Sequence, residues 1–270
     1  MRIIEPEAGP LPTPETQANG CFETMRAYQG KLFRLEDHLD RLYGSALFLG
    51  TQAPANRKAF ARQLTDALRR SGIREAVVRV ALIPQTGKDA RPHIVVQEAL
   101  MPTAEDYRRG IRIAGVPAKR FSVGSITPQA KYSARVGSVM AVSDAQLRGV
   151  DEALFLDESG SVTESTASNF GMIKNGVVYT PPCALGLLAG ITRDVLEETA
   201  QAAGALFVEA PLTRHDCYNA DEAFLTSTLK EVLAVTQIDG RVIGTGRPGP
   251  ITKKLLKAFR ALVRRELKLK

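Results

Sequence analysis

A segment rich in Pro, Gly and Ser, PAKRFSVGSITPQA at 117–130, divides the chain into two halves. Both halves alternate strand-like runs with helical patterns, which is typical of folds that combine helices with sheets. We therefore expect an α/β (α+β) fold of two domains. The expected boundaries are residues 1–118 for a small N-terminal α/β domain, 119–130 for a connector and 131–270 for a larger C-terminal domain.

The first half begins with GCFETMRAYQGKLF, whose alternation predicts a β-hairpin that turns near Gln29 and Gly30. The leucine spacing over 35–46 predicts a helix, and RKAFARQLTDALRRSG predicts a second helix that stops at Gly72. AVVRVALIP and HIVVQEAL are predicted as neighbouring strands, with QTGKDARP as the loop between them. IRIAGVP adds one more strand before the connector.

The second half is predicted to open with a helix near 137–148, followed by the strand EALFLDE, a Glu-Ser-Gly turn and the strand SVTE. FGMIKNGVVYT predicts a second hairpin, because its Asn-Gly pair favours the tight turn between antiparallel strands. The helix TRDVLEETAQAAGA follows, with Thr192 as its expected N-cap and acids in its early turns. EAFLTST predicts a further strand.

The net charge of +7 comes from the C-terminal segment. Residues 251–270 hold eight Lys or Arg and one Glu, so the rest of the chain is neutral overall. Apolar residues recur there at helical spacing while basic residues fill the other positions, which predicts a docked helix with a solvated basic face. An arm that binds nucleic acid or a membrane is the alternative interpretation of the same charge.

The cysteines and the N-terminus bear on the compartment. Three cysteines, Cys21, Cys183 and Cys217, are an odd number without C-x-x-C spacing, which argues against a disulfide framework and a zinc site. The N-terminal MRIIEPEAGPLPTPE lacks the basic start and apolar stretch of a signal peptide, and no apolar run approaches membrane-spanning length. We therefore expect a cytoplasmic protein without a metal ion.

Four positions carry side chains that could do chemistry. Lys131 stands alone in PQAKYSARVGS among mostly uncharged residues, although a solvated loop lysine is the ordinary alternative. Glu164 ends a strand in SVTESTASNF, whose hydroxyl groups could satisfy a buried carboxylate or could serve a turn. Thr192 opens a helix whose free N–H groups could hold a phosphate, as any helix N-terminus could. Arg41 lies off the leucine stripe of its helix, where an arginine is ordinarily exposed.

The order of five segments along the chain is more specific than any one of them. They are GCFETMRAYQGKLFRLEDHLDRL, AKYSARVG, DEALFLDESGSVTESTASNFGMIKNGVVYTPP, LLAGITRDVLEETA and FLTSTLKEV. Over roughly residues 20–240 this series resembles the fold type IV enzymes that use pyridoxal 5′-phosphate (PLP), the class IV aminotransferase family. That family includes branched-chain aminotransferases, D-amino acid transaminases and 4-amino-4-deoxychorismate lyases. The resemblance implies a pseudo-barrel-like C-terminal domain that binds PLP, and a homodimer.

The resemblance also implies a role for each candidate residue. Lys131 would form the Schiff base with PLP and would carry protons as the general base. Glu164 would pair with the pyridine nitrogen. The phosphate would be held by Arg41, by the backbone of Ile191 and Thr192, and by Thr228 of the TST run.

The residues that select a substrate depart from the patterns of the family. The four residues after Lys131 are YSAR, where branched-chain aminotransferases usually carry G-G-N-Y and aminodeoxychorismate lyases often carry an Asn-Arg pair. Arg79 in AVVRV does match, and could help to bind a carboxylate, although an ion-paired strand arginine is the ordinary alternative. We expect Phe22 and Arg79 to contact the substrate.

These observations predict a PLP-dependent aminotransferase of amino acid metabolism. It would move an amino group between a branched-chain-like or other small amino acid and a 2-oxo acid. The close alternative is a 4-amino-4-deoxychorismate lyase, which would release pyruvate and 4-aminobenzoate. A remote alternative is a nucleic-acid-binding protein that uses the basic C-terminal helix.

Overall fold

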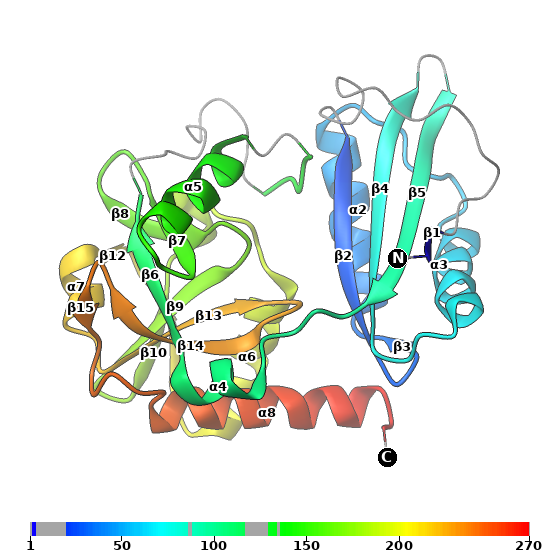
Figure 1. Cartoon of the computed structure of the whole chain (residues 1–270). Helices are drawn as coiled ribbons and strands as arrows, with labels where there is room; N and C mark the ends of the chain where they lie inside the picture. Colours follow the sequence, from blue (N-terminus) through cyan, green and yellow to red (C-terminus); the bar gives the residue numbers. More distant parts are fainter. Residues whose placement is uncertain (1, 4–19, 86–87, 117–128, 134–135, 270) are drawn as a thin grey trace. The chain divides into compact units, whose positions relative to one another are not determined.

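The computed structural model describes residues 2–3, 20–85, 88–116, 129–133 and 136–269, which form two compact units (Figure 1). Unit 1 comprises Met1–Leu100, Ala130–Arg135 and Val263–Lys270, and unit 2 comprises Met101–Gln129 and Val136–Leu262. Most of the expected connector, 119–128, lies outside the described residues. Each unit is described below by itself.

Unit 1 holds an antiparallel sheet in the order β1-β5-β4-β2-β3, with two helices packed on it. The strands are β1 (Arg2–Ile3), β2 (Cys21–Tyr28), β3 (Lys31–Leu32), β4 (Ala76–Gln85) and β5 (Lys88–Glu98), and the helices are α2 (Leu35–Phe48) and α3 (Arg57–Ser71). The predicted first hairpin is confirmed. Its turn residues Gln29 and Gly30 have φ of 50° and 80°, the positive values that match the twist of paired strands.

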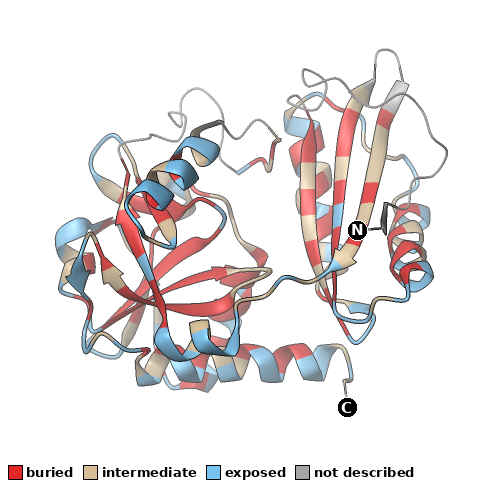
Figure 2. Ribbon diagram, in the orientation of Figure 1, coloured by how far each residue is buried: buried red, intermediate tan, exposed pale blue. Residues whose placement is uncertain are grey.

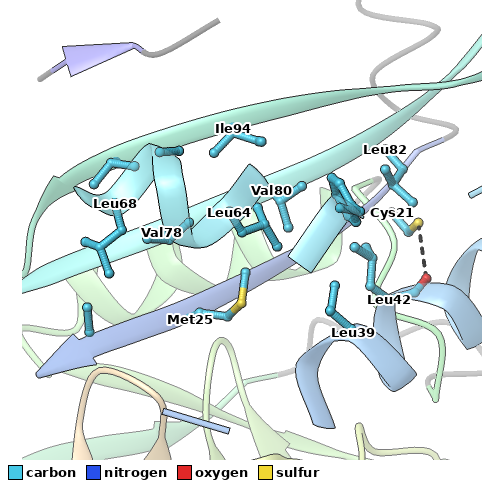
Figure 3. Close-up of a cluster of buried hydrophobic side chains, with 14 of the residues drawn as sticks. Cys21, Met25, Leu39, Leu42, Leu64, Leu68, Val78, Val80, Leu82 and Ile94 are labelled. Atoms are coloured by element: carbon cyan, nitrogen blue, oxygen red, sulfur yellow. Dashed lines mark hydrogen bonds between the residues drawn. The ribbon is translucent and has the colours of Figure 1, made fainter. Parts of the chain in front are cut away.

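The core of unit 1 lies between the sheet and its two helices. Along β2, buried residues alternate with half-buried ones, so Cys21 and Met25 point to the helices while Phe22 and Thr24 lie on the opposite face (Figure 2). Figure 3 shows the inward side chains of β2, β4 and β5 packed against leucines of α2 and α3. Alternation in the strands and 3.6-residue spacing in the helices therefore divide this sheet into a core face and an open face.

The predicted loop QTGKDARP, at 85–92, is wrong for most of its length. Strand β5 begins at Lys88, and Arg91 and Pro92 pair with Ile83 and Leu82 of β4. The composition of these residues suggested a turn, but the long antiparallel ladder of β4 and β5 extends through them. Cross-strand pairing outweighs the weak local preference of such residues.

Unit 2 is built on a ten-stranded sheet that curls back on itself. Strands β9, β13, β14, β6, β7 and β8 follow one another, and β8 pairs with β9 through Glu164 and Asn169. The strands are β6 (Ile111–Gly115), β7 (Glu152–Leu156), β8 (Ser161–Ser165), β9 (Asn169–Lys174), β10 (Val177–Thr180), β11 (Leu206–Glu209), β12 (Leu212–Thr213), β13 (Glu222–Ser227), β14 (Glu231–Ile238) and β15 (Arg241–Val242). The predicted hairpin at Asn175 and Gly176 is confirmed, with φ of 51° and 79°.

The helices of unit 2 lie around this sheet. They are α4 (Ala104–Arg109), α5 (Val136–Leu147), α6 (Ile191–Ala200), α7 (Arg214–Tyr218) and α8 (Pro250–Glu266), with short 3₁₀ turns η1 (Cys183–Leu185) and η2 (Gln201–Ala203). The last residues of α8, from Val263, are grouped with unit 1. The predicted C-terminal helix is confirmed as α8, which buries Leu255 and Phe259 and exposes Lys253 and Lys257. No helix of the described residues is long and apolar enough to cross a membrane.

Candidate active site

Lys131 belongs to a short segment that extends the edge of β2 in unit 1. The N–H of Phe22 donates to the carbonyl of Lys131 at 3.0 Å, and the N–H of Ser133 donates to the carbonyl of Gly20 at 2.8 Å. On its other side, the N–H of Lys131 donates to Ser45 Oγ of α2 at 3.0 Å. Both backbone polar groups of Lys131 are therefore hydrogen-bonded, one to a strand and one to a helix.

The ring of Phe22 lies near two cationic side chains. Lys131 Nζ is 4.9 Å from the ring centroid, and the guanidinium carbon of Arg79 is 5.5 Å from it. The register of the sheet explains this arrangement, because Thr24 pairs with Arg79 and Phe22 with Ala81, so Phe22 and Arg79 are diagonal neighbours on the open face. Phe22 and Arg79, the two residues expected to contact the substrate, thus lie near each other and near Lys131 within unit 1.

Arg41 is held in a buried ion pair. Its Nε donates to Glu23 Oε1 at 2.6 Å and its Nη2 donates to Glu23 Oε2 at 2.9 Å. His38, one turn earlier in α2, shares Glu23 Oε2 at 2.7 Å. The Glu23 side chain is fully buried and the Arg41 side chain is only 13% exposed, so the expectation of an exposed helical arginine is wrong. The buried carboxylate of Glu23 attracts the guanidinium group of Arg41 toward the core of unit 1.

The charges of this cluster follow from its burial. Burial alone would raise the pKa of the Glu23 carboxyl, but Arg41 and His38 outweigh that cost and hold the pKa below its usual range. Burial lowers the pKa of His38, and the positive charge of Arg41 acts in the same direction against the attraction of Glu23. We assign an ionised Glu23, a charged Arg41 and a neutral His38 that donates its Nδ1–H.

Glu164 lies where the sheet of unit 2 closes. The carboxylate is buried, and its Oε2 accepts the N–H of Leu188 at 3.1 Å and the side-chain amide of Asn169 at 3.3 Å. Asn169 also donates to the carbonyl of Leu188 at 2.8 Å. One asparagine therefore fixes both the carboxylate and the segment that leads into helix α6.

Helix α6 begins next to this carboxylate. Its N-cap is Gly190, so the prediction of Thr192 as N-cap is wrong, because the Asn169 contacts keep the chain extended up to Gly190 and Thr192 is already helical. An alanine methyl at Gly190 would collide with Asn169 Oδ1. Within the described residues, the backbone N–H groups of Ile191 and Thr192 make no hydrogen bond. N–H groups of this kind, at the positive end of a helix, are the donors that an anion prefers.

Thr228 lies half-buried in the turn between β13 and β14. The same turn carries Lys230, whose Nζ donates to Glu152 Oε1 at 2.8 Å and to Ser168 Oγ at 3.3 Å. Glu152 in turn accepts the hydroxyl of Thr166 at 3.2 Å. These contacts tie the turn after β8, which follows Glu164, to the turn that holds Thr228.

The donor sets fit the cofactor that the resemblance implies. In unit 2, the N-terminus of α6 and the hydroxyl-bearing Thr228 turn offer donors to a phosphate. Glu164 offers a buried carboxylate to a protonated ring nitrogen. Lys131 offers a half-buried primary amine. Among the residues the structure describes, no group of His, Cys, Asp and Glu could hold a metal ion.

The thiols offer little chemistry. All three cysteines are free, and burial raises the pKa of Cys21 and Cys217 to about 12. Thiols that stay protonated at neutral pH are poor nucleophiles.

Several residues around these candidates had not been predicted: Glu23, His38, Ser45, Asn169 and Gly190. Glu23 does leave a signal in the sequence, because the alternation of GCFETMR places it in phase with the buried Cys21 and Met25. A carboxylate at a core position requires a cation nearby, and HLDRL supplies one at Arg41. The contacts of Ser45 and Asn169 depend on which strands pair, and no local pattern announces them.

The comparisons with known proteins all point to aminotransferases, and each covers most of the chain. The family description "Amino-transferase class IV" matches residues 20–238. A putative branched-chain-amino-acid aminotransferase of Methanocaldococcus jannaschii is 40% identical, over 90% of this chain and 86% of the relative. A D-alanine aminotransferase of Bacillus licheniformis is 32% identical, over 89% and 86%. The solved branched-chain amino acid aminotransferase from Thermobaculum terrenum in its PLP form superposes with a TM-score of 0.86 at 26% identity, over 94% and 88%. These relatives do not favour the lyase alternative.

Proposed function

The chain belongs to the class IV aminotransferases, a PLP-dependent family of fold type IV, and on this premise we propose that it transfers the amino group of a branched-chain amino acid to a 2-oxo acid. The relatives support the substrate class, since the M. jannaschii relative carries the branched-chain name. Because a D-alanine aminotransferase is also among the relatives, the preference for the L or the D enantiomer of the amino acid must be measured.

One observation carries the substrate class: Lys131 Nζ and the guanidinium carbon of Arg79 both lie near the Phe22 ring, at 4.9 and 5.5 Å from its centroid. An amino acid presents an amine, a carboxylate and, in the branched-chain series, an apolar side chain. In unit 1 a primary amine and a guanidinium both lie near one apolar ring surface. The Arg79 side chain is exposed on the open face of the sheet, so its guanidinium is available to a carboxylate.

We assign the cofactor contacts as follows. When bound, PLP supplies the electron sink that stabilises the charge left when a proton leaves the α-carbon of the substrate. The amine of Lys131 would bind the cofactor covalently and would carry that proton. Glu164 would pair with the ring nitrogen. Arg41, the N–H groups of Ile191 and Thr192 and the hydroxyl of Thr228 would each donate to the phosphate.

A substrate panel tests this function. We expect amino transfer to 2-oxoglutarate with L-leucine, L-isoleucine and L-valine at kcat/KM at least about tenfold above that with D-alanine. Arg79→Gln removes a charge-assisted contact to the carboxylate and should lower kcat/KM for L-leucine about 10- to 100-fold. Arg62→Gln, an exposed arginine of α3, is the matched control and should leave it unchanged. A higher kcat/KM with D-alanine, or no effect of Arg79→Gln, would contradict the proposal.

We also propose that the enzyme is a homodimer that uses helix α5 at its interface. The outer face of α5 exposes Val139, Met140 and Leu147, at 65%, 61% and 88% of their full area. Three large apolar side chains on one short helix are typical of a contact surface rather than of a free one. Light scattering of the purified protein should give the mass of two chains, and Met140→Glu should shift it toward one. A monomer in the wild type would refute this part.

A further inference from the structure

Helix α2 carries one group that the proposed function places at the cofactor, Arg41, and contacts another, Lys131. His38, Arg41 and Ser45 follow one another at spacings of three and four residues, so they lie on one face of the helix. This face looks toward β2 and toward the segment of Lys131, all within unit 1. The first two residues bind Glu23, and the third binds the backbone of Lys131.

The Ser45 hydroxyl has a fixed orientation. It donates to the carbonyl of Arg41 at 2.7 Å, the ordinary bond of a helical serine to the residue four positions earlier. Because a hydroxyl has one proton and two lone pairs, this bond leaves its oxygen free to accept, and it accepts the N–H of Lys131 at 3.0 Å. Ser45 is 2% exposed, so water does not compete for either bond.

We propose that Ser45 is a positioning residue for the reaction, which fixes the main chain of Lys131 to helix α2 so that the Lys131 amine is held beside the Phe22 ring. The proposal rests on the proposed function of Lys131. Without the Ser45 bond, the Phe22 N–H still holds the Lys131 carbonyl, but the peptide group that precedes Lys131 loses its link to helix α2 and can rotate. Rotation would carry Nζ away from its place 4.9 Å from the ring.

The positioning role can be distinguished from a contribution of Ser45 to the stability of helix α2. Alanine is a better helix former than serine, so Ser45→Ala would not weaken α2 through propensity. Any loss beyond that of the bond to the Arg41 carbonyl must therefore come from the contact with Lys131. Thr65 of α3 makes the same kind of bond, from its hydroxyl to the carbonyl of Ala61 at 3.0 Å, and is exposed. Thr65→Ala is therefore the matched control within the same unit.

The first test reads the contact itself, without the cofactor. In the PLP-free protein, amide hydrogen exchange of the peptide that contains Lys131 should be about tenfold faster in Ser45→Ala than in the wild type, because one net hydrogen bond is lost. Thr65→Ala should leave that peptide unchanged. If Ser45→Ala does not fold, Ser45→Cys, whose thiol accepts only weakly, should speed the exchange in the same direction. Unchanged exchange in a folded variant would overturn the proposal.

The second test reads the consequence for the reaction. In the PLP-loaded enzyme, Ser45→Ala should lower kcat about tenfold with little change in the KM for the amino acid, because the amine is misplaced while the substrate contacts at Arg79 remain. Equal kcat in wild type and variant would overturn the positioning role. If the wild type transfers no amino group at all, the proposed function fails, and the exchange experiment still reports on the contact.

Discussion

Replacement of Lys131 by alanine should abolish amino transfer, with a fall in kcat on the order of 10⁴-fold or more, because one side chain serves both as covalent anchor and as proton carrier. The visible absorption band of lysine-bound PLP should disappear in the same variant. The fold should survive, since both backbone contacts of Lys131 use main-chain atoms that alanine retains.

The matched control for this change is Lys254→Ala. Lys254 is an exposed lysine of α8, and its loss removes the same charge without touching either backbone contact of Lys131. Steady-state kinetics and absorption spectra of the two variants, prepared side by side with excess PLP, decide the matter. If Lys131→Ala keeps the band, another lysine binds the cofactor and the assignment of Lys131 is wrong.

Replacement of Glu23 by glutamine should cost about 3–5 kcal/mol of unfolding free energy, because it leaves the charge of Arg41 buried without its carboxylate. Urea denaturation at neutral pH measures this loss. Glu36→Gln breaks an exposed ion pair between α2 and α3, with Arg57 at 2.9 Å, and should cost less than about 1 kcal/mol. Equal losses in the two variants would show that the buried cluster contributes no more than a surface pair.

The effect of Glu23 should also depend on pH. Its pKa in the folded protein is below the ordinary value, so its stabilisation is present above the pKa of an unfolded glutamate, about 4.3, and is lost as the pH falls below it. The difference in stability between wild type and Glu23→Gln should therefore be constant from pH 5 to 7 within about 1 kcal/mol and shrink as the pH falls below about 4. A difference that grows toward acid would contradict an ionised Glu23.

The fold could be predicted from sequence where local chemistry decides the structure. Positive φ at Gln29–Gly30 and Asn175–Gly176 is a property of those residue pairs, and both hairpins formed as expected. Helix α3 ended at Gly72 for the same kind of reason. The loop at 85–92 could not be predicted from composition, because its residues are held by pairing with β4 over a long ladder.

The same distinction between local sequence and tertiary pairing holds for the residues of the candidate site. Lys131, Arg41 and Glu164 could be named because each stands in a recognisable run of sequence. The residues that hold them in place could not, since Ser45 meets Lys131 across 86 positions and Asn169 meets Glu164 only because β8 and β9 pair. Glu23 lies between these cases, because its place in the strand alternation marks it as buried without saying which cation it meets.

The most direct test of the central claim is the half-reaction. The purified enzyme, loaded with PLP, is mixed with L-leucine in the absence of any oxo acid, and the visible band is followed before and after a 2-oxo acid is added. If the chain is an aminotransferase, the band falls as one amino group is taken up per site, and it returns when the oxo acid carries that group away. A band that does not respond to an amino acid, or that falls without returning, would contradict amino transfer.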